Sequence, residues 1–361
     1  MKIKETPPLL PKRLSLIDQT VASLRHGIAS GHWLDRLPSE RELCDLLQVS
    51  RTTIRGALAE MQRSGWLGVS NRQRRRIKTQ SQQPYGGAGK RVVALLFPSS
   101  LQSMHSRTMF VIDALRAYLG KLGYATESHV QTACFSAHPT RALEKLVRDH
   151  PAAVWIVFGS REPMQRWFTR RRLPVLIFGS CQPGIDIQSV DADHHAACHH
   201  AGGVLWRKGH RRIAFLIPQK AFGGELDSEQ GLREVLQDLP GVQLHVLRHD
   251  GTAAHVCTLV DKSMRSPQPP TAYLVTHAEH ALAVMTHLLR HGKRIPQDVA
   301  LISRDSHAFL SSTSPPISHY GIDPALLARR VVAAARQLVS TRTLTAHPIR
   351  LMPKFVPGGT V

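Results

Sequence analysis

The chain has 361 residues, enough for two or three domains, and carries 47 Lys and Arg against 26 Asp and Glu, a formal net charge of +21. A surplus of this size favours a polyanionic partner. No apolar run is long enough to cross a bilayer, and residues 1–14 hold no apolar signal core, so we expect neither a membrane protein nor an exported one. Five scattered cysteines without a C-x-x-C pair fit a reducing cytoplasm better than a disulfide framework, and we expect a cytoplasmic protein.

Three helices are predicted in the N-terminal part of the chain, where residues 1–90 hold 16 basic and 7 acidic side chains. An amphipathic helix covers residues 15–33. Ser39 then stands as a helix N-cap with Glu42 at the capping-box spacing, and Ser50 caps a second short helix. Two capped helices joined by a short turn predict a helix-turn-helix. Their apolar positions are Leu43, Leu46 and Leu47 in the first, and Ile54, Leu58 and Met61 in the second.

The polar side of the second short helix has the composition of a major-groove reader. Arg51 and Arg55 can each form two hydrogen bonds to a guanine, and Thr52 and Thr53 can contact a thymine methyl group or a phosphate. The N-terminus of the helix also attracts phosphate. The alternative is that these side chains only cap and solvate two small helices, and for Ser50 a capping role is expected as well.

A basic hairpin and a linker are predicted to follow the helix-turn-helix. Residues 66–69 and 75–78 read as two short strands around the polar turn 70–74, which would form a wing. Arg72 and Arg74 in this turn can reach phosphate or a narrow minor groove, although a solvated charge run is the competing interpretation. Residues 80–90 have the composition of a linker, so we predict a DNA-binding domain over residues 1–79.

From residue 91 onward, short apolar runs alternate with helical patterns. This alternation predicts an α/β fold with doubly wound parallel sheets, and about 270 residues are too many for one sheet, so we expect two lobes over 91–361. The predicted strands are 92–98, 152–159, 174–180, 213–218, 271–276 and 299–303, and the predicted helices include 109–122, 196–208, 230–236, 279–291 and 325–339.

The helix-turn-helix stretch resembles the winged helix-turn-helix of the GntR family of bacterial transcription regulators. The family pattern is roughly L-P-S-E-R and then V-S-R-T-T-V-R-x-A-L, and here these motifs read LPSER over 37–41 and VSRTTIRGAL over 49–58. The family's usual G-x-G in the wing turn is missing from residues 70–74. The resemblance implies operator DNA contacts from Arg41, Ser50, Arg51, Thr52, Thr53 and Arg55.

Residues 91–361 resemble the effector-binding domain of the LacI family. The motifs are DAD over 191–193, GHRRIAFLI over 209–217 and RIPQDVALISRD over 294–305, where the family has V-D, G-H-R-R-I-A-F-I and G-x-x-I-P-x-D-V-x-V-I-G-F-D-D. The resemblance implies a periplasmic-binding-protein-like module of two lobes around a ligand cleft, with the chain crossing near residues 190, 310 and 341. A GntR-type head on a LacI-like body resembles the arabinose-repressor type of regulator.

Ligands of α/β lobes bind outside the carboxyl ends of the strands, and candidate ligand contacts follow from that rule. Asp305 matches the position of the family's ligand-binding Asp. The alternative is a structural role, in which Asp305 only caps the next turn. Ser228 and His277-Ala278 replace the family's Arg and Asn-Asp, so either the ligand differs from the usual sugars or the cleft is degenerate. The candidate ligand-binding residues are Asp305, Arg304, His277, Phe222, Ser228 and Ser160, with Trp167 as an alternative aromatic ring.

The histidine-rich run over residues 193–200 raises the question of a metal site. His195 and His199 have the i, i+4 spacing that lets two imidazoles share an ion. The family places this helix face on the surface, and no H-E-x-x-H motif accompanies it, so we expect no metal. The chain also has neither a G-x-S-x-G nor a G-x-G-x-x-G motif in the required context, so we expect no enzyme and no cofactor.

These features together predict a ligand-responsive transcription regulator. The expected protein is a repressor that binds double-stranded operator DNA as a homodimer and responds to a small polar metabolite, with sugars as one candidate class. One alternative is a constitutive DNA-binding regulator whose C-terminal domain only dimerises. Another is a small-molecule-binding protein or α/β enzyme with an accessory head.

Overall fold

The computed structural model describes residues 15–29, 33, 36–64, 66–68, 77, 92–104, 106–341 and 348–361. The chain divides into two compact units, Met1–Gly89, which we call the head, and Lys90–Val361, which we call the body. Arg72, Arg74 and the predicted linker 80–90 lie outside the described residues.

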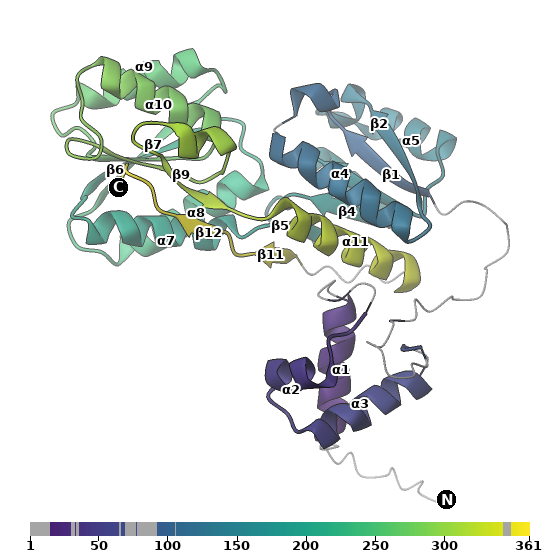
Figure 1. The fold of residues 1–361 in the computed structure, drawn as a ribbon. Coiled ribbons are helices and arrows are strands. Elements are labelled where there is room, and N and C mark those ends of the chain that lie inside the picture. The colour runs from purple at the N-terminus through teal and green to yellow at the C-terminus, as the bar shows by residue number, and fades with distance from the viewer. Residues whose placement is uncertain are drawn as a thin grey trace, which may run out of the picture. The chain divides into compact units, whose positions relative to one another are not determined.

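The described part of the head contains α1 (Leu16–Ala29), α2 (Glu40–Leu47) and α3 (Arg51–Arg63), seen in Figure 1. An antiparallel bridge joins Leu67 to Ile77, the two residues that the predicted hairpin would pair. Leu43 is buried as expected, but Leu46 is 55% exposed, so the predicted apolar face of α2 is narrower than the leucine pattern indicated. The shared core joins α1, α2, α3 and the bridge, and consists of Val21, Leu24, Ile28, Trp33, Leu37, Leu43, Ile54, Ala57, Leu58, Met61, Leu67 and Ile77.

The body is built from two lobes, each with a six-stranded sheet between two layers of helices (Figure 1). In the first lobe the strand order is β11-β5-β4-β3-β1-β2, and neighbouring strands run parallel. Helices α4 and α11 pack on one face of this sheet, and α5 and α6 pack on the other. The elements are β1 (Val92–Phe97), α4 (Ser106–Lys121), β2 (Ala125–Val130), α5 (Thr140–Asp149), β3 (Val154–Phe158), α6 (Glu162–Arg171), β4 (Val175–Phe178), β5 (Ser189–Ala192), α11 (Pro324–Thr341) and β11 (Ile349–Leu351).

The second lobe repeats this plan with the strand order β12-β10-β9-β8-β6-β7. Only the pairing of β10 with β12 is antiparallel. Helices α7 and α8 cover one face, and α9 and α10 cover the other. The elements are α7 (His194–Arg207), β6 (Arg212–Pro218), α8 (Gly223–Gln237), β7 (Gln243–His249), α9 (Ala253–Met264), β8 (Ala272–Val275), α10 (Ala278–Arg290), β9 (Ala300–Ser303), β10 (Ser318–Gly321) and β12 (Lys354–Val356).

The chain passes between the lobes three times. The first passage lies between β5 and α7, close to the expected position near residue 190. The second lies between β10 and α11, at 321–324, and the third between β11 and β12, at 351–354. Both come later than the expected 310 and 341, because β10 still pairs with β9 in the second lobe and β11 pairs with β5 in the first.

The predicted doubly wound α/β architecture is confirmed, and the central strands show why the sequence revealed it. Strands β3, β8 and β9 are buried along their whole length, as expected for strands covered by helices on both faces. No helix within the described ranges is long and apolar enough to span a membrane.

Candidate functional site

Helix caps set the start of the predicted recognition helix. In α2, the Ser39 hydroxyl accepts a hydrogen bond from the Glu42 backbone N–H, and the Glu42 carboxylate accepts one from the Ser39 N–H at 2.7 Å. In α3, the Ser50 hydroxyl accepts from the Thr53 N–H at 3.1 Å. These contacts satisfy backbone donors that a helix start would otherwise leave open, so both predicted N-caps are confirmed.

The first turns of α3 present a polar face to solvent. The side chains of Arg51 and Arg55 are 70% and 60% exposed, and their Nε atoms lie 3.5 Å and 3.0 Å from the same oxygen of Glu40. Ile54 and Leu58, by contrast, are buried in the core of the head. Exposed ion pairs contribute only about 0–1 kcal/mol, so this contact orients the two guanidinium groups without holding them firmly. The other predicted DNA contacts are exposed or half-buried: Arg41, Ser50, Thr52 and Thr53.

In the body, a buried ionic cluster lies at the carboxyl ends of β8 and β9. The Arg304 side chain is 3% exposed, and its Nε lies 3.2 Å from Oδ1 of Asp305. The same guanidinium group donates to the Ser228 hydroxyl at 3.0 Å and to Glu225 Oε1 at 3.4 Å. Burial by itself lowers the pKa of Arg304, but the carboxylates of Asp305 and Glu225 more than offset this and hold that pKa above its usual range. Arg304 therefore stays charged inside the lobe.

His277 completes this cluster. Its Nε2 lies 3.7 Å from Glu225 Oε1, and its Nδ1 lies 3.5 Å from Asp305 Oδ2. Four of the six predicted ligand residues, Asp305, Arg304, His277 and Ser228, are thus brought together by strand ends and by α8. We call these four residues and Glu225 the carboxyl-end cluster.

The Arg304 guanidinium lies beside Ser228, the position at which the LacI family usually has an arginine. The LacI resemblance puts an arginine at the position of Ser228, and here the guanidinium group of Arg304 reaches that serine from the end of β9. Beneath it, burial raises the pKa of the Cys198 thiol to about 11, so this cysteine is a neutral packing residue.

The remaining predicted ligand residues have other contacts. The Phe222 ring lies under the Arg161 guanidinium at 4.1 Å, which makes it part of a contact between the two lobes. The Ser160 hydroxyl accepts a hydrogen bond from the buried amide of Gln165 at 2.9 Å. Trp167 packs in the core of the first lobe and is only 8% exposed, so it offers no ring face to a ligand.

Several polar residues that join the lobes were missed by the sequence prediction. Arg350 of β11 pairs with Asp227 of α8 at 3.1 Å, and it also donates to the hydroxyl of Ser180. Ser180 in turn donates to Asp191 at 2.9 Å. Of these residues only Asp191 lay in a quoted motif, DAD over 191–193, and no motif marked Arg350, Asp227 or Ser180. They are far apart in sequence and meet only where the strand ends of one lobe face α8 of the other.

The start of α8 approaches the first lobe so closely that only glycine fits. A Cβ atom on Gly223 would lie 2.3 Å from the carbonyl oxygen of Cys181 and 2.8 Å from that of Ser180. Because both contacts are with backbone, rotation of a side chain cannot relieve them. Gly223 therefore sets the distance between the lobes at this point.

We expect Gly223→Ala to lower the free energy of unfolding by about 1–3 kcal/mol, the usual cost of overpacking, and to weaken any response that needs the lobes to close. Urea unfolding of the full chain measures the first effect. Gly120→Ala is the matched control, since a Cβ there meets nothing within 4 Å and a helical alanine is favourable by about 1 kcal/mol over glycine. Equal stability of the two variants would show that the lobes can move apart at this contact without a cost in stability.

The histidines of α7 show no ion-binding geometry. His195 Nε2 lies 2.7 Å from Glu234 Oε2, and the His195 and His199 ring centroids are 6.4 Å apart. Hydrogen bonding to Glu234 accounts for the position of the His195 side chain.

The comparisons with known proteins agree with both parts of the fold. Residues 16–77 match the family described as bacterial regulatory proteins, gntR family, and residues 203–361 match the periplasmic binding protein-like domain. The chain therefore combines a GntR-type helix-turn-helix domain with a LacI-like α/β body.

The similar proteins are regulators by name. The chain is 23% identical over 168 residues to the HTH-type transcriptional repressor CytR of Escherichia coli K12, across 45% of this chain and 49% of CytR. A LacI-type transcriptional regulator structure from Bacillus cereus subsp. cytotoxis has a TM-score of 0.68 at 22% identity, covering 76% of this chain and 99% of that one. The structure of the regulator CelR with cellobiose has a TM-score of 0.65 at 17% identity, covering 97% and 100%. The chain spans about half the length of the curated relatives it matches.

Proposed function

We propose that this protein is a ligand-responsive DNA-binding transcription regulator, acting as a repressor whose hold on its operator is changed by a small polar metabolite. The observation that carries the proposal is the presence, in one chain, of a capped helix-turn-helix with exposed Arg51 and Arg55 and a two-lobed body with a polar cluster at its strand ends.

The same observation supports a division of the chain into domains. We assign DNA binding to residues 1–79, a linker to 80–90, and effector binding and dimerisation to 91–361. A homodimer in the cytoplasm would place two heads on the half-sites of an inverted repeat, which is how helix-turn-helix proteins read their operators. Arg72 and Arg74 would add phosphate or minor-groove contacts.

The chemistry of the cluster indicates which effectors suit it. Carboxylates of Asp305 and Glu225 accept hydrogen bonds from hydroxyl groups, while the Arg304 guanidinium donates to both carboxylates, to Ser228 and to the Gly224 carbonyl, and so holds the two acids in place. A polyhydroxylated metabolite matches this set, and the similar fold of the CelR–cellobiose complex supports a sugar as the first class to test. We assign Asp305, Arg304, His277 and Ser228 to the effector, with Phe222 at the edge of the site.

The test uses the full chain and an operator selected from random duplex DNA. Sugars and nucleosides are screened by thermal shift, because a ligand that binds only the folded protein raises the unfolding midpoint by mass action. We expect Asp305→Ala to weaken effector binding about tenfold to a hundredfold, since a hydrogen bond to a charged group contributes about 1.5–3 kcal/mol. Operator affinity without effector should not change.

Asp298→Ala is the matched control for that experiment. It removes a carboxylate from the same lobe, but one that pairs with the exposed Arg294 at 2.7 Å, away from the carboxyl-end cluster. If Asp305→Ala and Asp298→Ala respond equally to every effector found, the assignment of the site is wrong.

A constitutive DNA-binding regulator is the second candidate function. It is favoured by the way Arg304, Glu225 and Asp305 already bond one another and by the loss of the family's Asn-Asp at His277-Ala278. A screen in which the selected operator binds normally and no compound shifts either the midpoint or the operator affinity would support this alternative.

A further inference from the structure

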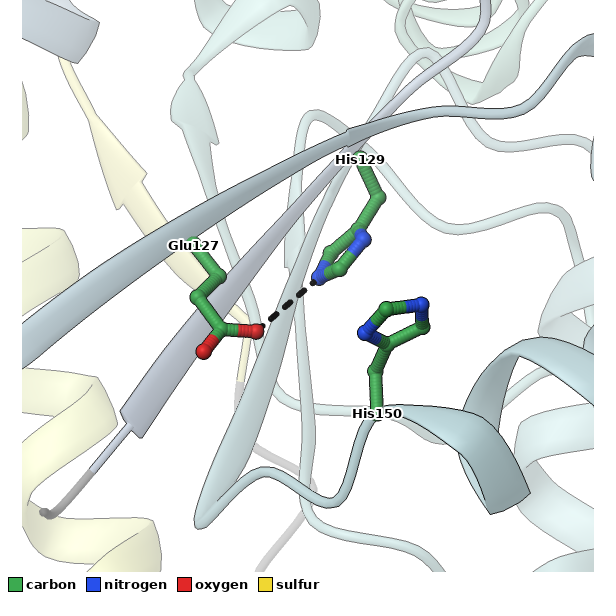
Figure 2. Close-up of side chains that lie close together, drawn as sticks. All are labelled: Glu127, His129 and His150. Carbon is green, nitrogen blue, oxygen red and sulfur yellow. Dashed lines mark ion pairs between the residues drawn. The ribbon is translucent and has the colours of Figure 1, made fainter.

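Three potential metal ligands meet at the edge of the first lobe. Glu127 and His129 lie on β2, and His150 follows the last turn of α5. One carboxylate oxygen and one nitrogen from each imidazole all lie within 4.8 Å of one another. Figure 2 shows the two rings and the carboxylate converging on the space between β2 and the end of α5.

The strand register explains how this convergence arises. Glu127 and His129 are two residues apart, so they project from the same face of β2. Their partners on β1 are Ala94 and Leu96, which belong to the core beneath α5 and α6. The face that carries the two ligands is therefore the face on which α5 ends, and His150 stands at that end.

His129 carries an unsatisfied nitrogen. Its side chain is 10% exposed, and within the described part of the chain its buried Nε2 has no hydrogen-bond partner. Glu127 Oε2 is 3.6 Å from this nitrogen, and the His150 ring centroid is 4.5 Å from that of His129. A buried polar atom left in this state destabilises the fold, and a ligand on Nε2 would offset that destabilisation.

The surroundings of His129 shift its pKa. Burial, and then the charge of His150, lower the pKa of His129, while Glu127 opposes them.

We propose that Glu127, His129 and His150 bind a divalent transition metal of the zinc class, with an open fourth position for water. Two imidazole nitrogens and a carboxylate oxygen are a donor set typical of zinc. In a tetrahedral site, neighbouring ligand atoms are about 3.3 Å apart, so the pair at 3.6 Å is nearly in place and the exposed His150 closes the set by rotation. The metal would fasten the edge strand to α5, and the sequence prediction of no metal would be wrong at this site.

A second group of three potential metal ligands, Asp261, His287 and His291, already has hydrogen-bond partners. Asp261 Oδ1 lies 2.9 Å from His287 Nε2, and the His291 Nδ1 lies 2.8 Å from the His287 carbonyl oxygen. These three side chains are also close enough for an ion, but hydrogen bonds already account for the positions of both imidazoles. The triad is therefore the natural comparison within the same protein.

The test is a titration of metal-stripped full-length protein with Zn²⁺, followed by thermal shift and calorimetry, and with Co²⁺, followed by the visible bands of tetrahedral cobalt. We expect one tight site that raises the unfolding midpoint, with the rise reversed by EDTA. Glu127→Gln and His150→Gln should weaken this site at least tenfold. Both positions are exposed, so these variants test the ligands without disturbing the core as a change at His129 would.

Two control variants separate this site from other histidines. His138→Gln removes an exposed histidine of the same lobe, and His291→Gln disrupts the second triad. Both should bind the first zinc ion like the unmodified protein. The proposal is overturned if the tight site is lost only in His291→Gln, if Glu127→Gln and His150→Gln bind like the unmodified protein, or if no saturable site is found.

Discussion

Replacing Arg51 or Arg55 by alanine will lower the affinity for the selected operator about tenfold to a hundredfold. A good pair of hydrogen bonds from arginine to a base contributes about 1–3 kcal/mol of discrimination, and 1.4 kcal/mol is a factor of ten. The two side chains lie one turn apart at the start of α3, and both are more than half exposed. Their contact with Glu40 is too weak to compete with a base.

Arg63→Ala is the matched control, because it removes the same charge from the other end of the same helix. Arg63 is 76% exposed and pairs with Glu60 at 2.6 Å. It should lose only the nonspecific electrostatic contribution, which all three variants share. Binding to the operator and to random duplex is measured at several salt concentrations, so that the specific part is separated from counterion release. Equal losses in the three variants would mean that α3 does not read the bases.

Arg304→Met will lower the free energy of unfolding by about 3–5 kcal/mol, the usual cost of removing one partner from a buried ion pair. The guanidinium group bonds both Asp305 and Glu225, and its side chain is 3% exposed. Methionine fills a similar volume, so the substitution leaves no large cavity. The loss of stability therefore measures the cost of leaving two carboxylates unpaired in a poorly solvated site. Urea unfolding measures the effect.

Arg294→Met is the control for this prediction. Arg294 also pairs with an aspartate, but it is 73% exposed, so its loss should cost no more than about 1 kcal/mol. Adding Asp305→Asn to Arg304→Met should recover part of the stability, because one buried charge is removed along with its partner. If Arg304→Met costs no more than Arg294→Met, the cluster is better solvated than its exposure indicates.

The sequence was most informative where a pattern is local. The capping pairs of α2 and α3 depend on residues three positions apart, so the helix-turn-helix could be read directly from Ser39, Glu42 and Ser50. The six strands predicted for the body are all central ones, whose apolar runs follow from burial on both faces. Asp305 and His277 could be placed near the carboxyl-end cluster because each follows the end of a strand by two residues.

The strands that were missed lack a long apolar run: β2, β5, β7, β10, β11 and β12. Of these, β5 and β10 lie inside their sheets and are mostly buried, but they read only SVDA and SHYG. The edge strands β2 and β7 read ATESHV and QLHVLRH, and because they are partly exposed they contain no long apolar run to detect. For the same reason, the juxtaposition of Glu127 and His129 with His150 was invisible, since it depends on a register between β1 and β2 and on where α5 ends.

The sequence by itself therefore determined the domain types, the capped starts of α2 and α3, and the positions of the six central strands along the chain, because these depend on short-range spacing and on total burial. Tertiary structure alone decided which polar groups meet. Arg304 reaches Ser228 and Glu225 across 76 and 79 positions of the chain, and Gly223 is required by a backbone in the other lobe. Such contacts are set by how two sheets and α8 pack, and nothing in the residues around each partner encodes that distance.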